Sequence, residues 1–317
     1  MNTSPLISVQ HLSRYYGKLA AVSDISFTLL PGEVLGFLGP NAAGKSTTMN
    51  MLCGNLAPSH GSIDICGIDL LEQPKQAKAQ IGYLPETPPL YRELTVNEYL
   101  TYCAKINRIP KNKIIRACDL AKQRCGLEHV GKRLINNLSK GYQQRVGIAQ
   151  AIIHSPPIVV LDEPTVGLDP IQIREIRQLI KDLGNEHGVI LSTHILPEVQ
   201  VTCDRVQIIS QGKLVFNDRL EHLQNKDRAE STRVHFNHPP ELHTLNNLTG
   251  VNTVEATGKG RFKIHHELDT DIAEIIINLA VEEKLGLTEL TPETKSLEQI
   301  FVDITTADET QNTEDVA

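Results

Sequence analysis

The sequence has no tryptophan, and tyrosine and phenylalanine bring its aromatic content to only 4%. Proteins that bind single-stranded nucleic acid stack bases on aromatic side chains, so this scarcity argues against such a surface. The 317 residues carry a net charge of −7 and contain no block of basic residues. Because a phosphate backbone requires a positive surface, we expect no nucleic-acid partner.

Long hydrophobic runs and paired cysteines are also missing. No apolar run reaches the roughly 18 to 20 residues that a helix needs to cross a bilayer, and residues 1–5 do not begin a basic and apolar secretion signal. The six cysteines are scattered without a C-x-x-C pair, which is typical of free thiols in a reducing cytosol. We therefore expect a cytoplasmic protein that relies on another chain for any passage through a membrane.

Hydrophobic patterning predicts an α/β domain. The continuous apolar run 34–38 indicates a buried strand, which leads into a glycine-rich loop and a helix over 46–53. Half-buried strands are predicted at 6–10 and 21–29, buried strands at 81–84, 158–161 and 189–192, a helix at 171–183, and a hairpin of 206–210 with 213–215 around Gln211-Gly212. The stretch 94–150 is mainly helical in pattern, with Thr95 and Ser139 as N-caps.

A change of composition divides the chain. We expect a first domain over 1–225 with a helical part at about 87–150, a polar linker at 226–232, and a small α+β domain at 233–305. The order in the second domain is predicted as strand, helix, strand, a turn at 258–260, strand, helix, strand, helix. The polar and acidic residues 306–317 predict a disordered tail.

The glycine-rich loop fits the pattern G-x-x-x-x-G-K-[ST]. Its residues are Gly39, Pro40, Asn41, Ala42, Ala43, Gly44, Lys45, Ser46 and Thr47. Backbone N–H groups and the start of a helix form an anion nest for phosphates. Lys45 places a charge between the β- and γ-phosphates, Ser46 offers its hydroxyl to Mg²⁺, and Thr47 reaches the α-phosphate. The loop therefore predicts an ATP site with Mg²⁺ as cofactor.

Two acids follow the buried strand at 158–161. Asp162 lies at the carboxyl edge of the predicted sheet, where ligands bind in α/β folds, and can hold Mg²⁺. Glu163 faces the γ-phosphate side and can polarise the attacking water as general base. The alternative is a pair of solvated acids at a strand end, and the phosphate loop upstream favours the catalytic interpretation.

The segment 138–144 reads L-S-K-G-Y-Q-Q. Ser139 can cap a helix, and Gly141 permits close approach of a phosphate to the backbone; an ordinary helix start is the alternative. Together with the phosphate loop and Asp162-Glu163, this segment resembles the ABC-type ATPases. Their signature motif reads LSxGQ, and this chain differs from it only at Tyr142. The resemblance implies a P-loop NTPase domain with a RecA-like core, an antiparallel β subdomain and a helical subdomain.

The same resemblance implies roles for further residues. Ser139, Lys140, Gly141 and Gln143 would close over ATP bound to a second subunit, giving a dimer, expected to be a homodimer, with two sandwiched ATPs. Tyr16, or alternatively Tyr15, would stack on adenine; Asp169, after Gly167-Leu168, would communicate across the dimer; and His194 would be the switch histidine that contacts the γ-phosphate.

Two positions depart from the family pattern. Glu86 stands where most members have Gln, and its carboxylate can still ligate Mg²⁺ and sense the γ-phosphate. Ala42 stands where most members have Gly. Glycine is indispensable only where φ is positive. Because alanine stands at position 42, we expect that this position does not need a positive φ.

Residues 86–91 and 165–198, with the closing segment 296–301, resemble the ABC-2-type exporters of bacteria, closest to the gliding-motility-associated and multidrug branch. This implies an ATPase subunit on the cytoplasmic face of the inner membrane, which docks on separate permease chains through the helical region after Glu86. ATP-driven closure and opening of the dimer would power export.

Two other functions remain open. A soluble ABC ATPase acting on ribosomes or DNA usually has tandem nucleotide domains or a long coiled coil before its signature, whereas here a compact helical segment separates Lys45 from Ser139. A nucleotide-gated regulator would use the second domain as its effector. The presence of both Glu163 and His194 predicts genuine ATP turnover.

Overall fold

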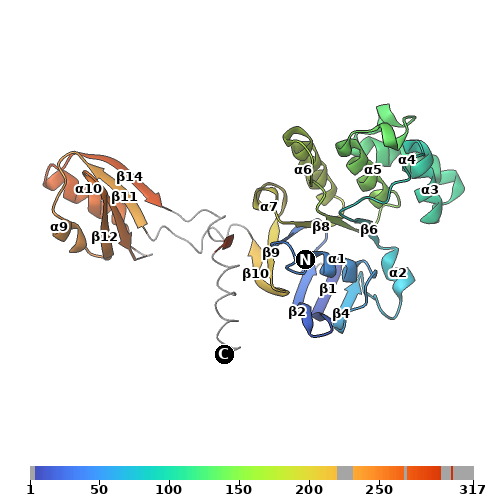
Figure 1. Ribbon diagram of the computed structural model, residues 1–317, viewed down its shortest axis with the longest axis horizontal. Helices are drawn as coiled ribbons and strands as arrows, with labels where there is room; N and C mark the ends of the chain where they lie inside the picture. Colours follow the sequence, from blue (N-terminus) through green and yellow to red (C-terminus); the bar gives the residue numbers. More distant parts are fainter. Residues whose placement is uncertain (1–3, 220–230, 268–269, 294–300, 303–317) are drawn as a thin grey trace. The chain divides into compact units, whose positions relative to one another are not determined.

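The computed structural model describes residues 4–219, 231–267, 270–293 and 301–302 (Figure 1). These residues fall into two compact units, 4–219 and 231–302. The predicted tail at 306–317 and residues 226–230 of the predicted linker lie outside the described residues. Within the described ranges, no helix combines the length and apolar character needed to span a bilayer.

The first unit contains two sheets. A six-stranded sheet has the order β10-β9-β3-β8-β7-β6, in which only β10 is antiparallel to its neighbour. Its strands are β3 (Val34–Leu38), β6 (Ile81–Leu84), β7 (Ile158–Asp162), β8 (Gly188–Thr193), β9 (Arg205–Ser210) and β10 (Lys213–Arg219). An antiparallel sheet of order β2-β1-β4-β5 consists of β1 (Ile7–Tyr16), β2 (Leu19–Leu29), β4 (His60–Ile65) and β5 (Ile68–Asp69). Neither β4 nor β5 was among the strands predicted from the sequence.

Seven α-helices of the first unit are described, and α3, α4 and α5 gather in one group in Figure 1. They are α1 (Lys45–Leu52), α2 (Pro74–Lys78), α3 (Val96–Ile106), α4 (Ile114–Cys125), α5 (Lys140–Ile152), α6 (Pro170–Gly184) and α7 (Leu196–Thr202). Both predicted N-caps are confirmed. Thr95 forms a capping box with Glu98 at the start of α3, and the Ser139 side chain accepts from the backbone N–H of Tyr142.

Alternation along the central strands explains why they read as continuous apolar runs. Leu35 and Phe37 of β3 pack in a core with α1 and the antiparallel sheet. Val34 of the same strand, with Val159 and Leu161 of β7, packs on the opposite face in a core shared with α3 to α6. Because both faces are covered, every residue of β3 and β7 is buried. The parallel strands β3, β6, β7 and β8 end at one edge of the sheet, where Asp162 is the last residue of β7 and the phosphate loop, Glu86 and His194 follow the other strands.

The second unit has the predicted order of strands and helices as far as it is described. It consists of β11 (Ser231–Phe236), α9 (Leu242–Asn246), β12 (Val251–Gly258), β13 (Arg261–His266), α10 (Ile272–Glu282) and β14 (Leu287–Glu293). The sheet order β12-β13-β11-β14, with all neighbours antiparallel, is that of a split βαβ fold. β11 starts at Ser231, two residues before the predicted domain boundary. Most of the predicted last helix lies outside the described residues.

Candidate functional site

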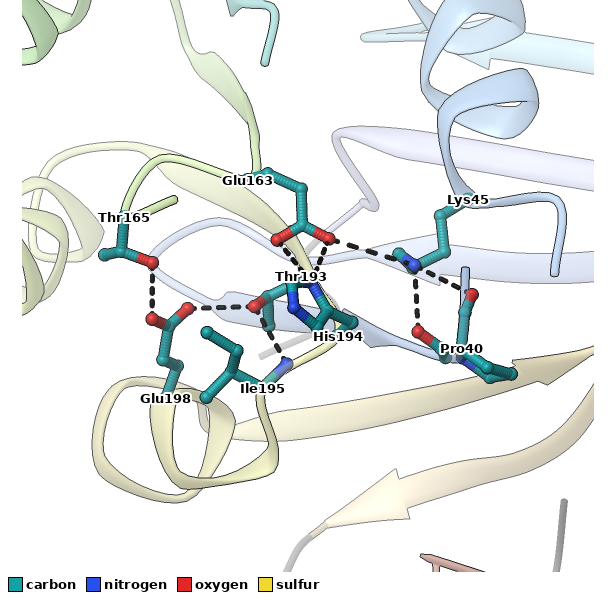
Figure 2. Close-up of polar contacts among 9 residues, drawn as sticks. Pro40, Lys45, Glu163, Thr165, Thr193, His194, Ile195 and Glu198 are labelled. Atoms are coloured by element: carbon teal, nitrogen blue, oxygen red, sulfur yellow. Dashed lines mark hydrogen bonds and ion pairs between the residues drawn. The ribbon is translucent and has the colours of Figure 1, made fainter. Parts of the chain in front are cut away.

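The phosphate loop joins β3 to α1 and holds its lysine in place. The Lys45 side chain is buried, and Nζ donates to the carbonyl oxygens of Gly39 at 2.8 Å and Pro40 at 3.0 Å (Figure 2). Nζ also lies 3.8 Å from Oε1 of Glu163. Burial lowers the pKa of Lys45, while the carboxylates of Glu163, Asp162 and Glu86 oppose this shift. The loop thus presents one partly desolvated cation among acids.

Backbone conformation in this loop corrects one expectation. Ala42 has a φ of 64°, in the left-handed region, so the prediction that this position does not need a positive φ is wrong. Gly44 has a φ of 108°, and a Cβ there would lie 2.5 Å from the carbonyl oxygen of Ala21. Gly44 is therefore required both for its conformation and for the space it leaves, whereas Ala42 occupies a conformation that glycine would adopt more easily.

Glu163 lies directly after β7 and faces both Lys45 and His194. Nδ1 of His194 is 2.9 Å and 3.0 Å from the two carboxylate oxygens of Glu163 (Figure 2). Glu163 is buried and has a φ of 48°, which is unusual for a residue with a side chain. Burial raises the pKa of Glu163, and the neighbouring His194 and Lys45 oppose this shift. The carboxylate is therefore placed as an acceptor beside the loop that holds the cation.

Asp162 is the last residue of β7 and is buried. Its Oδ1 has no hydrogen-bond partner, an exception among buried polar atoms. Burial raises the pKa of Asp162, and the nearby hydroxyls of Ser192 and Ser46 oppose this shift. An unpaired carboxylate oxygen beside a serine at the start of a helix fits a hard cation such as Mg²⁺, which prefers oxygen ligands.

A cavity of about 460 Å³ brings nine of the predicted site residues together. It is lined by Ala21, Asn41, Ala42, Gly44, Lys45, Ser46, Thr47, Glu86, Glu163, Val166 and His194. Tyr16, also predicted to contact the nucleotide, does not line the cavity; its ring is half exposed, and the guanidinium of Arg14 lies 4.9 Å from the ring centroid. Tyr15 packs edge-on against His60 instead. A cation, an acidic acceptor, an imidazole and a helix start around one cavity can bind a polyphosphate and activate water.

The signature residues do not line this cavity. Ser139 Oγ accepts from the backbone N–H of Tyr142 at 3.4 Å, and Gln143 Nε2 donates to the carbonyl oxygens of Ile135 at 3.2 Å and Leu138 at 3.1 Å. Gln143 therefore fastens the loop before α5. Lys140 and Gln143 line a second cavity of about 410 Å³, together with Glu86.

Two further residues of the signature segment, and Asp169, have local contacts. A Cβ at Gly141 would lie 2.5 Å from the side-chain oxygen of Gln172. Asp169 caps α6, since its Oδ1 accepts from the backbone N–H groups of Ile171 at 3.0 Å and Gln172 at 2.9 Å. The Tyr142 hydroxyl lies 3.0 Å from Nε2 of His129, so the residue that departs from the signature makes a local contact.

Sequence reasoning missed one buried acid next to the site. Glu198 of α7 is 1% exposed and hydrogen-bonds to Thr165 and Thr193 (Figure 2). The available signal was an acid between the apolar residues Leu196 and Val199 of a short helix, four residues after His194. An acid at such a position needs a partner inside the fold.

Comparisons with known proteins agree with this geometry. A family model described as "ABC transporter" matches residues 22–166. The bacitracin transport ATP-binding protein BcrA of Bacillus licheniformis is 34% identical, over 94% of this chain and 97% of its own length. The linearmycin resistance ATP-binding protein LnrL of Bacillus subtilis is 31% identical, over 95% of this chain and 98% of its own length.

A solved structure described as the ATP-binding subunit of an ABC transporter superimposes with a TM-score of 0.63. It is 32% identical in sequence and covers 70% of this chain and 92% of its own. This chain thus has a phosphate loop, two acids at the end of β7 and a two-sheet core. Its sequence is also similar to ABC transporter ATP-binding proteins over nearly its whole length. The chain therefore belongs to the ATP-binding proteins of ABC transporters, ATPases in which hydrolysis is coupled to transport.

Proposed function

We propose that Glu163 is the general base of this ATPase and that His194 orients it and contacts the γ-phosphate. The observation that carries this proposal is the placement of Glu163 between Nζ of Lys45 and Nδ1 of His194 on the wall of one cavity. Lys45 would neutralise charge that builds up on the phosphates. The loop residues Gly39 to Thr47 would bind the phosphates, with Gly39 and Pro40 acting through their carbonyl contacts to Lys45.

Mg²⁺ would be held by Asp162, Ser46 and Glu86. The unpaired Oδ1 of Asp162 supports this assignment, as do the positions of Ser46 and Glu86 on the cavity wall. All three residues supply oxygen atoms, the ligands that Mg²⁺ prefers. When bound, the ion would neutralise phosphate charge. Glu86, where the family pattern has Gln, would add a further negative charge close to that ion.

We also propose a dimer in which each signature segment completes the nucleotide site of a second copy of the chain. Ser139, Lys140 and Gly141 lie at the start of α5 but outside their own subunit's phosphate-loop cavity, which is what a contribution in trans requires. Gln143 and Asp169 would act there through the loops that they fasten. Tyr16, half exposed, would offer its ring to the adenine base.

The transport role would require permease chains at the cytoplasmic face of the inner membrane. An amide-lined recess of about 450 Å³, formed by Asn50, Asn55, Tyr83, Asn107, Gln150 and His154, suits a docking segment of a permease. The Tyr99 hydroxyl hydrogen-bonds to Pro89 and Gln150 of this recess. The exposed Tyr91 packs against the Tyr99 ring, and the exposed Tyr102 packs against Tyr91. Tyr91, Tyr102, Asn107 and Gln150 belong to the helical region predicted to receive the permease.

Export is the direction of transport that we propose. The relative named for linearmycin resistance is similar over nearly the whole chain, including the second unit, and removal of a toxic compound is one way to obtain resistance. The pattern of residues 86–91 favours the ABC-2 type and its gliding-motility-associated and multidrug branch. Cargo selection would belong to the permease chains.

A tagged Glu163→Gln variant tests this proposal in two steps. We expect it to bind MgATP while its turnover falls about 10²- to 10⁴-fold, the usual contribution of a general base. In detergent-solubilised host membranes with MgATP, it should then co-purify with a multi-spanning membrane protein in near-equal amounts. Glu163→Gln combined with Lys45→Ala, which weakens nucleotide binding, is the matched control. Unchanged turnover would remove Glu163 from its role, and recovery of ribosomal or DNA-repair proteins without a membrane chain would overturn the transport role.

A further inference from the structure

The carboxylate of Glu198 is buried beside the proposed catalytic residues but has no place in the chemistry described above. It lies in α7 with 1% of its surface exposed, where an isolated charge is costly. Each of its oxygens accepts a hydrogen bond from a threonine hydroxyl. Thr165 donates to Oε1, and Thr193 donates to Oε2 at 2.9 Å (Figure 2). Nη2 of Arg177 in α6, at 3.9 Å from Oε1, supplies a countercharge.

The two threonines are the near neighbours of the proposed catalytic pair. Thr165 lies two residues after Glu163, and Thr193 immediately precedes His194. Both threonines are buried. Thr193 Oγ1 also accepts from the backbone N–H of Ile195 at 3.1 Å, so its own proton points to Glu198. One carboxylate therefore joins the loop after β7 to the end of β8.

The loop after β7 needs such a fastening. Glu163 has a φ of 48°, and strained backbone persists only where the surroundings hold it. The backbone N–H of Glu163 donates to the carbonyl oxygen of Ser192 at 2.9 Å, which joins the start of this loop to the end of β8. The Thr165–Glu198–Thr193 bridge joins them a second time, through a residue shortly after Glu163 and the residue just before His194. Together these contacts fix the position of Glu163 relative to His194.

We propose that Glu198 is a positioning residue that holds Glu163 and His194 in register for water activation, through Thr165 and Thr193. This inference rests on the proposed roles of Glu163 and His194. Glu198 itself touches neither the cavity nor a reacting atom. Its loss would separate the general base from its partner while leaving Lys45 and the phosphate loop unchanged.

The test compares steady-state ATP hydrolysis by Glu198→Ala and by Glu33→Gln in the full chain. Glu33 is the matched control, because it is also a largely buried carboxylate with a close cation, Arg205 at 2.6 Å, but precedes β3 at the end opposite the phosphate loop. We expect Glu198→Ala to lower kcat about 10- to 100-fold, with KM for ATP changed less than about threefold, since positioning errors act on the chemical step. Glu33→Gln should leave kcat per folded molecule unchanged. Equal losses of kcat in both variants would overturn the proposal.

Two further variants separate positioning from simple destabilisation. Glu198→Gln keeps one acceptor and should restore part of kcat relative to Glu198→Ala. In a His194→Ala background, Glu198→Ala should lower kcat by less than about twofold, because residues that act as a unit are not additive. If Glu198→Ala lowered kcat in the His194→Ala background by the same factor as in the unmodified chain, the proposal would be overturned.

If Glu198→Ala does not fold, Thr165→Val replaces it, because valine removes the hydroxyl donor at similar volume. Thr165→Val should lower kcat about three- to tenfold with KM nearly unchanged; normal kcat would overturn the proposal. Failure of the proposed function gives a different result. In that case the unmodified chain does not hydrolyse ATP, or Glu163→Gln turns over at the unmodified rate.

Discussion

Nδ1 of His194 faces both carboxylate oxygens of Glu163, at 2.9 Å and 3.0 Å, so one ring nitrogen orients the whole carboxylate. His194→Ala should therefore lose most ATP turnover, by about 10²-fold or more, if His194 serves the proton-transfer step. Nucleotide binding should persist, because the contacts that hold Lys45 come from Gly39 and Pro40. Phosphate release and binding of a fluorescent ATP analogue measure the two effects. His60→Ala, on the antiparallel sheet, is the control, and equal turnover of both variants would contradict the prediction.

Ala42→Gly should stabilise the protein. Ala42 has a φ of 64°, where an L-residue costs roughly 1 to 2 kcal/mol more than glycine. Glycine also increases the conformational entropy of the unfolded chain, which offsets about 0.5 to 1 kcal/mol of this stabilisation. The net gain in the free energy of unfolding is therefore small. Urea unfolding should show a higher midpoint. Ala43→Gly is the matched control because Ala43 is a buried neighbour outside the left-handed region, and it should lower the midpoint. A lower midpoint for Ala42→Gly would contradict the prediction.

Gly141→Ala tests the proposed contribution in trans. Inside one subunit, the new Cβ meets only the end of the flexible Gln172 side chain, at 2.5 Å, so we expect little loss of stability. A phosphate from a second subunit could no longer approach the backbone closely, and turnover should fall at least tenfold, an effect of about 1.4 kcal/mol on the barrier. Gln172→Ala removes the local collision and serves as the background control. Recovery of turnover in the double variant would show that Gly141 acts through local packing and would contradict the role in trans.

The second unit should lose stability in acid through Glu293. Its hydrogen bond with Lys263, joined by one with Arg233, holds the pKa of Glu293 below the ordinary glutamate value against the opposing effect of partial burial. A depressed pKa in the folded state contributes stability above the ordinary value of about 4.3, which is lost as pH falls through the folded-state pKa. Hydrogen exchange of β11 and β14 in the full chain, followed from pH 6 to pH 3, measures this loss. Glu293→Gln should flatten the acid dependence, whereas Glu283→Gln, at the exposed end of α10, should retain it. The same slope in all three proteins would contradict the prediction.

Local pattern was enough to predict the elements that position the site. Two apolar runs, 34–38 and 158–161, are buried on both faces of the sheet. Such runs predict central strands from the sequence alone. Strand β4 was missed because its alternation is limited to Ile63 and Ile65 between two glycines. Its identity as a strand depends on pairing with β1, where Ile7 lies opposite Ile65 and Val9 opposite Ile63.

The candidate site shows the same division between local and distant information. The phosphate loop and the acids after β7 were recognisable from neighbouring residues. Glu198 was not, because its partners Thr165 and Thr193 are brought to it by packing of α7 against the end of β8. The φ of Ala42 was misjudged for a related reason, since alanine at that position gives no sign of the left-handed conformation that the surrounding loop imposes.

The left-handed backbone at Glu163 has an evolutionary consequence. Glycine would adopt a φ of 48° with less strain than glutamate, but it supplies no carboxylate. Selection for thermal stability and selection for turnover therefore act in opposite directions on this codon. A library of variants at position 163 sorted for heat resistance alone would be enriched in glycine and asparagine, and the same library sorted for growth that depends on transport would retain glutamate.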